Sequence, residues 1–305
     1  MTNETEQSIF TIDCHYLRPS FAAAFLLVEN GRAIFIENNT THALPFLMKA
    51  LENLGIAAEN VDYLIVTHAH LDHSGGTSAL IGRCPNARII AHPKAAKTLA
   101  DPEKLIQSAK RVYGEEQFNK LYGVINPIPL SKIHLLQDGE TLNWQNRILT
   151  FFYTLGHASH HVCIHDSKSE GVFTGDAFGL FYPDLQTQGL FILPSTSPID
   201  YDPVEAKKSV EKICSFKPRR LFLTHYGEVE KVTEAKNELL KNLDIHEAQY
   251  HWAKENFHFG DKLSRIVEDR LKKIYSSYVE FLKLDLELNA QGIAFAAQRG
   301  KKNGS

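Results

Sequence analysis

Cysteine is scarce in this sequence of 305 residues. The four cysteines, Cys14, Cys84, Cys163 and Cys214, lie far apart, and none of them forms a Cys-x-x-Cys pair. This spacing argues against both a disulfide framework and a zinc site built from thiolates. A reducing compartment, the cytoplasm, is therefore predicted.

An excess of positive charge is also missing. The 33 Lys and Arg residues are outnumbered by 36 Asp and Glu residues, which gives a formal net charge of −3. The one compact basic run is Lys301-Lys302 near the C-terminus. Binding to phosphate backbones depends on clustered Lys and Arg, so nucleic acid is not predicted as a partner.

Long hydrophobic runs are absent too. No apolar stretch approaches the length of a transmembrane helix, although hydrophobic residues make up 43% of the chain. Residues 1–8 are polar and acidic and do not resemble a signal peptide. We therefore expect a globular protein without a membrane partner.

What the sequence does contain, from residue 9 to about residue 226, is an alternation of strand-like and helix-like segments. The expected strands are 21–28, 33–37, 63–66, 87–91, 148–153, 162–165, 172–174 and 221–224, and the expected helices are 41–54 and 203–216. After Gly227, long segments rich in Glu, Lys and Leu predict helices alone, with Gly260 between two of them. The pattern indicates an α/β (α+β) region followed by an all-helical C-terminal region.

The densest chemical signal is the run Thr67-His68-Ala69-His70-Leu71-Asp72-His73, which follows an apolar strand. Imidazole and carboxylate groups are ligands of zinc, iron and manganese. Alternating ligands on a sharp loop can face two neighbouring ions, so we expect His68 and His70 to share one ion and Asp72 and His73 to share the other.

Three more candidate ligands, His157, Asp176 and His225, each follow a strand-like run. Residues just past the ends of several strands converge at one edge of a sheet, where a rigid scaffold can hold them. The sequence therefore predicts a metal site assembled from separate loops.

These motifs resemble those of the metallo-β-lactamase-fold hydrolase superfamily, over roughly residues 20–230. The His-x-His-x-Asp-His signature stands at residues 68–73, followed by Gly75-Gly76. Thr154-Leu155-Gly156-His157, Thr174-Gly175-Asp176 and Thr224-His225-Tyr226-Gly227 are similar to the later motifs. Two departures are Leu155, where the family often has proline, and Glu37-Asn38-Asn39, where an Asp-x-Gly often supports the site.

The resemblance implies a binuclear site. Its ligands would be His68, His70 and His157 for one ion and Asp72, His73 and His225 for the other, with Asp176 bridging the two. Two divalent ions, zinc first and iron or manganese as alternatives, are the implied cofactors. Asp72 and Asp176 would take part in catalysis, while His161 and Tyr226 are candidates for orienting a ligand or contacting substrate.

The implied fold is a four-layer αβ/βα sandwich. We expect the metallo-β-lactamase-fold domain to span residues 9–230, a helical extension to span 231–300, and residues 301–305 to form a disordered tail. The extension either covers the site or forms an interface, and residues 282–297 suit a homodimer contact. The apolar loop 178–198 is expected to wall a pocket for a small molecule.

Within this family the leading interpretation is a hydrolase that uses a metal-bridging hydroxide on a small ester, thioester or lactone. Its glyoxalase II-like and lactonase-like members are the nearest in pattern. Two alternatives stay open: an oxidoreductase like the mononuclear-iron sulfur dioxygenases, and a sensor or regulatory protein with a vestigial site. The run Ser195-Thr196-Ser197 lacks the context of a serine nucleophile and is expected to be a loop.

Overall fold

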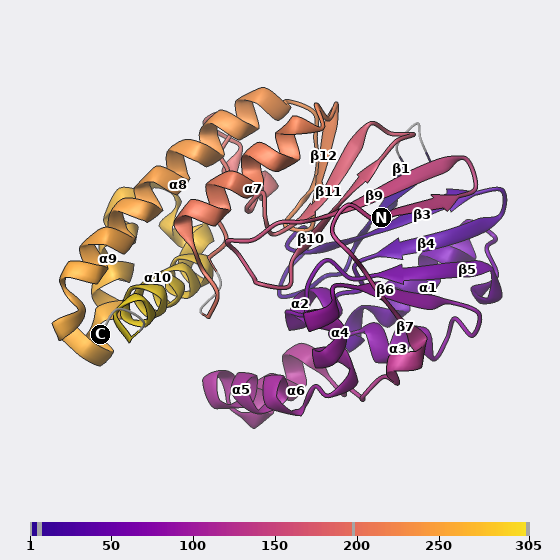
Figure 1. Cartoon of the computed structure of the whole chain (residues 1–305), viewed down its shortest axis with the longest axis horizontal. Coiled ribbons are helices and arrows are strands. Elements are labelled where there is room, and N and C mark those ends of the chain that lie inside the picture. The colour runs from indigo at the N-terminus through magenta and orange to yellow at the C-terminus, as the bar shows by residue number, and fades with distance from the viewer. Residues whose placement is uncertain (1, 5–7, 197–198, 303–305) are drawn as a thin grey trace. The chain divides into compact units, whose positions relative to one another are not determined.

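The computed structural model describes residues 2–4, 8–196 and 199–302. They form two compact units, whose elements are labelled in Figure 1. Unit 1 comprises Met1–Tyr153, His160–Gly175 and Arg219–Glu228, and unit 2 comprises Thr154–Ser159, Asp176–Pro218 and Val229–Ser305. The domain boundary expected at residue 230 stays a prediction.

The first sheet is mixed. Its seven strands lie in chain order: β1 (Thr2–Glu4), β2 (Ile9–Asp13), β3 (Ala23–Glu29), β4 (Arg32–Ile36), β5 (Val61–Ile65), β6 (Arg88–Ala91) and β7 (Ile133–Leu135). Pairing is antiparallel from β1 to β4 and parallel from β4 to β7. The expected strands at 21–28, 33–37, 63–66 and 87–91 are confirmed.

The second sheet has six strands. In spatial order they are β13 (Gly227–Val229), β12 (Arg220–Leu223), β11 (Gly171–Gly175), β10 (Val162–Asp166), β9 (Arg147–Tyr153) and β8 (Thr141–Trp144). The β11–β12 pair is parallel, whereas β8, β9, β10 and β11 pair antiparallel. The four strands expected between residues 148 and 224 are therefore confirmed.

The two sheets pack face to face in unit 1 through alternate side chains of their strands. On β4, Ile34 and Ile36 join Phe151, Phe173 and other residues of the second sheet in one buried cluster. Phe35 points the opposite way, as the period of two along a strand requires, and packs in a second cluster with helical residues. The first sheet thus has one face against the second sheet and one against helices.

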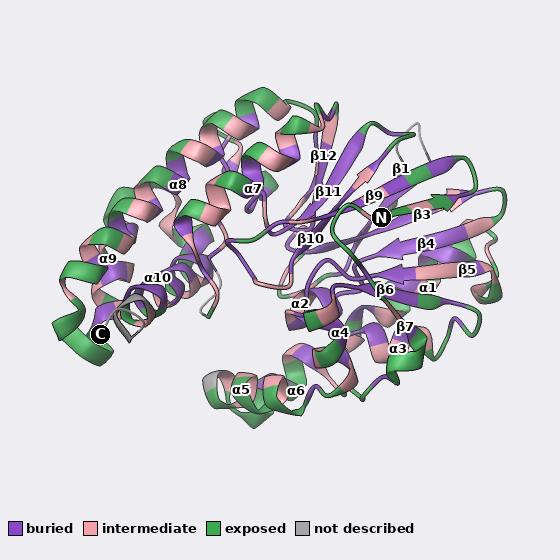
Figure 2. Cartoon of the chain, viewed as in Figure 1, coloured by how far each residue is buried: buried purple, intermediate pink, exposed green. Residues whose placement is uncertain are grey.

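In the described part of unit 1 the α-helices are α1 (Leu44–Asn53), α2 (Leu71–Ser74), α3 (Thr77–Ile81), α4 (Pro93–Ala100), α5 (Glu103–Tyr113) and α6 (Glu115–Tyr122). Short 3-10 turns lie at Thr41–Ala43, Ala58–Asn60 and Leu130–Lys132. Leu47 of α1, Leu80 of α3 and Leu99 of α4 cover the outer face of the first sheet. Figure 2 shows most strands largely buried, whereas the described residues of α5 are exposed or half-buried and most of those of α6 are exposed.

Unit 2 is mainly helical. Its α-helices are α7 (Pro203–Ser215), α8 (Val232–Glu255), α9 (Leu263–Ile274) and α10 (Val279–Lys302), and its 3-10 turns are Pro183–Leu185, Phe257–Lys262 and Ser276–Tyr278. Gly260, at a φ of 55°, lies between α8 and α9, as the sequence predicts. The two mixed sheets, their flanking helices and the helical C-terminal region confirm the predicted fold class.

The C-terminal helix α10 packs within its own unit. Leu282, Leu286 and Ile293 are fully buried, and α10 lies against α8 and α9. The homodimer through residues 282–297 stays a prediction. Of the expected tail, Lys301 and Lys302 end α10, and 303–305 lie outside the described residues, as do Ser197 and Pro198 of the loop 178–198.

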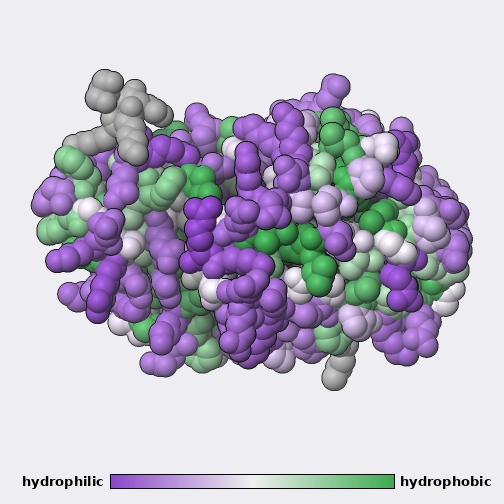
Figure 3. Space-filling model, turned by 90° about the horizontal axis from the view of Figure 1, so that it is seen from below, coloured by the Kyte–Doolittle hydropathy of each residue, from purple (hydrophilic) through white to green (hydrophobic). Residues whose placement is uncertain are grey.

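Over the described residues, no helix combines the length and apolar character that crossing a membrane requires. Figure 3 shows one face of the molecule on which hydrophilic side chains predominate and hydrophobic ones gather between them. Exposed apolar side chains are common on the surfaces of folded proteins.

Candidate metal centre

The first part of the candidate centre lies where β4 and β5 end. These two strands are parallel, so their C-terminal ends meet at the same edge of the first sheet. Glu37 follows β4 directly, and His68 and His70 lie in the loop after β5. The next residues form α2, which carries Asp72 and His73. The local order of strand, loop and short helix therefore gathers the histidine motif.

Backbone and amide hydrogen bonds fix this loop to the segment after β4. The amide of Asn38 donates to the carbonyl of His73 at 3.1 Å, and the Asn39 side chain donates to the carbonyl of Asp72 at 2.8 Å. Gly76 completes the contact by donating its N–H to Asn39. A Cβ on Gly76 would lie 2.6 Å from the carbonyl oxygen of Asn38, so the approach requires glycine.

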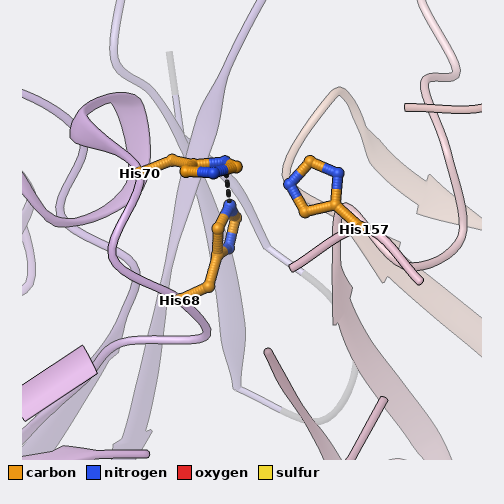
Figure 4. Close-up of side chains that lie close together, drawn as sticks. All are labelled: His68, His70 and His157. Atoms are coloured by element: carbon orange, nitrogen blue, oxygen red, sulfur yellow. Dashed lines mark hydrogen bonds between the residues drawn. The ribbon is translucent and has the colours of Figure 1, made fainter. Parts of the chain in front are cut away.

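His68 and His70 face one another through ring nitrogens. His68 Nε2 and His70 Nδ1 lie 2.9 Å apart, the contact drawn in Figure 4. Two imidazole nitrogens bound to one tetrahedral zinc lie about 3.3 Å apart, since each Zn–N bond is about 2.0–2.1 Å long. The observed pair is slightly closer than that, so the two rings fit a shared ion after a small movement.

Asp72, His73 and His225 form a second group within unit 1. Asp72 Oδ2 lies 3.4 Å from His225 Nε2 and 3.9 Å from His73 Nε2. One ligand atom from each of the three residues falls within 4.8 Å of the others. His225 arrives from the loop after β12, as its position in the sequence predicts. Unit 1 therefore carries five candidate ligands: His68, His70, Asp72, His73 and His225.

The other ring nitrogen of several ligands is occupied by an acceptor. His225 Nδ1 lies 2.7 Å from the carbonyl oxygen of Phe21, and His73 Nδ1 lies 3.2 Å from Glu37 Oε1. The carbonyl of Phe21 cannot donate, so Nδ1 of His225 carries the proton and Nε2 presents its lone pair; a Glu37 carboxylate sets the same tautomer in His73. Histidine ligands of metals commonly donate their second ring N–H to an acceptor in this way. The donor set and its tautomers fit divalent metal binding.

Glu37 is a component that the sequence indicated only as a departure from the family pattern. Its side chain is fully buried, and it accepts hydrogen bonds from the Thr67 hydroxyl and from His73. Ligand atoms of Glu37, His68 and His73 also lie within 4.8 Å of one another. A signal was present, because an acidic residue directly after β4 stands where the supporting aspartate was expected.

Unit 2 holds the remaining two predicted ligands side by side. His157 Nε2 lies 3.5 Å from Asp176 Oδ2. Ser195 contacts both of them: its carbonyl oxygen lies 3.0 Å from His157 Nδ1, and its hydroxyl donates to Asp176 Oδ2 at 2.9 Å. The predicted loop at Ser195 is thus part of the site, through contacts that its sequence context did not reveal.

The loop that carries His157 is fixed to the start of α7. The amide of Asp202 donates to the carbonyl of Gly156 at 3.0 Å, and Ser209 donates to the carbonyl of Leu155 at 2.6 Å. Gly156 adopts a φ of 108°, and a Cβ on it would lie 2.2 Å from the backbone nitrogen of Ala206. Glycine is therefore required before His157, whereas the proline that the family often has at position 155 is not.

Beside His157 and Asp176 lies a shallow pocket of unit 2, about 270 Å³ including the space open to solvent. Its lining residues are Leu155, His157, Asp176, Ala177, Gly179, Pro194, Ser195, Ala206, Leu239 and Leu243. Apolar side chains such as Leu239 and Leu243 line it beside the polar groups of His157, Asp176 and Ser195. The loop 178–198 contributes Gly179, Pro194 and Ser195 to it, and its role as the wall of a substrate pocket stays a prediction.

The model of the metallo-beta-lactamase superfamily matches residues 19–225 of the chain. The chain belongs to this family. The matched residues include all seven predicted ligands and the strands β4 and β5. The resemblance stated from the sequence is therefore confirmed at the level of the family.

Among its relatives is the metallo-beta-lactamase fold-containing protein ST1585 of Sulfurisphaera tokodaii, 26% identical over 61% of this chain and 72% of that protein. The crystal structure of ST1585 superposes with a TM-score of 0.62 and 22% identity, covering 78% of this chain and 86% of that one. This likeness confirms the fold.

Two relatives are named for an activity. The hydroxyacylglutathione hydrolase of Aeromonas hydrophila is 26% identical over 41% of this chain and 37% of its own length. The human acyl-coenzyme A thioesterase MBLAC2 is 26% identical over 37% of this chain and 39% of its own length. The chain thus spans well under half of either protein.

His161 and Tyr226, the two candidates for orienting a ligand or contacting substrate, lie in unit 1. His161 is fully buried, with its ring centroid 4.9 Å from that of His68. A Cβ on Gly175 would lie 2.5 Å from His161 Nε2, so the glycine before Asp176 makes room for this ring. Tyr226 packs partly buried against the core between the sheets.

His160 is a site neighbour that the sequence did not single out. Its Nδ1 accepts a hydrogen bond from the backbone N–H of Ala69 at 3.3 Å. Ala69 stands between His68 and His70, so His160 holds the backbone of the histidine motif. In sequence, this histidine lies beside the candidate His161 without any motif of its own.

Two tyrosines of unit 1 interact electrostatically with Asp72. The hydroxyl of Tyr16 donates to that of Tyr122 at 3.1 Å. Burial raises the pKa of both phenols far above the usual range, and the charge of Asp72 adds to the rise. Both side chains therefore stay protonated, neutral donors at physiological pH.

Proposed function

We propose that this protein is a metal-dependent hydrolase of small esters, thioesters or lactones that works with two divalent ions, zinc foremost. Following the family motifs, His68, His70 and His157 would hold one ion and Asp72, His73 and His225 the other, with Asp176 shared. The observation that carries the proposal is the tautomer set: in His73, His157 and His225, an oxygen acceptor occupies Nδ1 and leaves Nε2 for metal.

Divalent ions bound by such ligands supply an activated water at neutral pH and stabilise negative charge on a substrate oxygen. The chain contributes preorganisation. Glu37 holds His73, and the carbonyls of Phe21 and Ser195 hold His225 and His157. The rings of His73, His157 and His225 are thereby held with Nε2 available, which lowers the cost of binding.

The substrate class rests on the relatives that are named for an activity. The relatives named for an activity, a hydroxyacylglutathione hydrolase and an acyl-coenzyme A thioesterase, both act on thioesters by name. Thioesters are therefore the first substrates to test.

The proposal is tested by measuring bound metal and turnover together. Purified protein is analysed for zinc, iron and manganese, and then assayed with S-lactoylglutathione, acyl-coenzyme A thioesters, lactones, aryl esters and phosphodiesters. We expect about two metal ions per chain and turnover of thioesters or esters.

The variant Asp176→Ala removes the shared carboxylate, and Asp261→Ala removes an exposed carboxylate of unit 2 as its matched control. Turnover should fall by at least about a thousandfold in Asp176→Ala and stay unchanged in Asp261→Ala. Full activity of Asp176→Ala would contradict the binuclear proposal. Metal-loaded protein that leaves every substrate intact would contradict the hydrolase proposal.

A further inference from the structure

The C-terminal helix α10 reaches the two ligands of unit 2 through a single chain of hydrogen bonds. Its first link is Ser195, which contacts both ligands with different groups. The carbonyl oxygen accepts from His157 Nδ1 at 3.0 Å, and the hydroxyl donates to Asp176 Oδ2 at 2.9 Å. One residue therefore sets both the tautomer of His157 and the orientation of the Asp176 carboxylate.

The second link is Asn289 of α10, whose side chain is 3% exposed. Its Nδ2 donates to the carbonyl of Pro194 at 2.8 Å, and its Oδ1 accepts from the backbone N–H of Thr196 at 2.9 Å. The Thr196 hydroxyl adds a contact to the Asn289 carbonyl at 3.0 Å. Asn289 thus binds the residues on both sides of Ser195.

The chemistry of Asn289 matches this task closely. A side-chain amide offers both a donor for one backbone carbonyl and an acceptor for a backbone N–H two residues away. An aspartate would lose the donor, and a leucine of similar size would lose both groups. Because the contacts are buried, their loss leaves backbone groups without partners, and the loop has to shift.

Helix α10 is itself held firmly. Leu286 and Ile293, one turn on either side of Asn289, are fully buried. Asp285, four residues before Asn289, accepts a hydrogen bond from the Tyr182 hydroxyl at 3.1 Å. These contacts hold α10 in place where Asn289 binds the residues beside Ser195. A residue that positions ligands requires such support.

We propose that Ser195 and Asn289 are positioning residues of the metal site: α10 fixes through Asn289 the loop from which Ser195 orients His157 and Asp176 for metal binding. The inference rests on the proposed function of this site. It gives the C-terminal helices a specific role, since a side chain of α10 then contributes to metal affinity.

The experiment measures metal affinity in Asn289→Leu and Ser195→Ala by competition with a chromophoric zinc chelator, and follows cobalt(II) substitution by its visible absorption spectrum. Removing an outer partner of a metal ligand typically lowers affinity about 10–100-fold. We expect a loss in this range for both variants and an altered cobalt spectrum. Ser195→Thr, which keeps a hydroxyl, should restore most of the affinity.

The matched control is Asn242→Leu. Asn242 is a buried asparagine on α8 that donates to the carbonyl of Ile192 at 2.9 Å, so it resembles Asn289 in type, burial and partner. Among the described residues its hydrogen bonds go to Ile192, Glu238 and Tyr275, and none goes to residues 194–196. Its replacement should lower the melting temperature much as Asn289→Leu does, yet leave metal affinity and the cobalt spectrum unchanged.

The outcomes separate this inference from the proposed function. Equal loss of metal affinity in Asn242→Leu and Asn289→Leu, or wild-type affinity in Ser195→Ala, would overturn the positioning role while hydrolysis could persist. Specific loss of affinity in a protein that hydrolyses nothing would support the positioning role and reject the hydrolase. If Asn289→Leu does not fold, Ser195→Ala and Ser195→Thr decide the question alone.

Discussion

At the scale of single residues, the candidate centre depends on which ring nitrogen of each histidine remains available to bind a metal ion. Glu37, the carbonyl of Phe21 and the carbonyl of Ser195 each occupy one Nδ1. Because Glu37 is the only one of the three acceptors that belongs to a side chain, it can be replaced without moving the backbone.

Glu37→Gln should weaken metal binding by about 10–100-fold, the usual effect of altering the partner of a histidine ligand. The neutral amide accepts a weaker hydrogen bond from His73 and places an NH₂ group in a fully buried position. Zinc affinity is measured by chelator competition. Glu29→Gln serves as control, because Glu29 is a buried carboxylate of the same unit that pairs with Arg147 and Lys168. An equal loss of zinc affinity in both variants would refute the specific role of Glu37.

At the scale of elements, the sequence predicted the strands and the ligand loops because both signals are local. Apolar runs predicted β3, β4, β5 and β6, and the motif after β5 predicted its ligands as part of a sharp loop, not the short helix α2. The resemblance indicated that the segment after β4 supports the site, but the individual hydrogen bonds of Asn38 and Asn39 to the histidine motif were not predictable, since they join residues far apart in sequence. Ser195 and His160 were missed for the same reason, because their partners are distant along the chain.

Gly76 tests the contact between those two segments. Gly76→Ala would place a Cβ 2.6 Å and 2.7 Å from the backbone oxygens of Asn38 and Thr40, which cannot move away as a side chain could. Unfolding free energy should fall by about 1–3 kcal/mol, the usual cost of overpacking. The control is Gly82→Ala, where the nearest atom lies at 3.4 Å, and it should change stability little. Urea denaturation of both variants measures this difference, and similar midpoints would contradict the packing argument.

At the scale of the whole molecule, helices that lie far from the histidine motif in sequence can still shape the site. Composition predicted an all-helical region after residue 227, but it left open whether that region covers the site or forms an interface. The contacts of Asn289 suggest a third role, support of a ligand loop from behind. Long-range hydrogen bonds of this kind leave no periodic signal in a sequence.

A second property of the helical unit is its dependence on pH. His246 on α8 is fully buried, and neither ring nitrogen has a hydrogen-bond partner among the described residues. Burial lowers the pKa of His246 to about 3, whereas an unfolded chain gives a histidine pKa of about 6.5. Below pH 6.5 the unfolded state therefore binds a proton that the folded state does not bind, and stability falls as the pH is lowered.

The loss due to His246 should reach about 2–3 kcal/mol between pH 6.5 and pH 4.5, at about 1.4 kcal/mol per pH unit. Above pH 6.5 this residue contributes no pH dependence, because the imidazole is neutral in both states. His246→Leu removes the titrating group and keeps an apolar side chain in the core, so its unfolding free energy should decline less steeply over the same interval. Denaturant unfolding of both proteins at pH 7.0, 6.0, 5.0 and 4.5 measures the slopes.

His251→Leu, which removes an exposed histidine from the same helix, should keep the wild-type slope. Identical slopes for His246→Leu and wild type would show that another group governs the acid response of the fold.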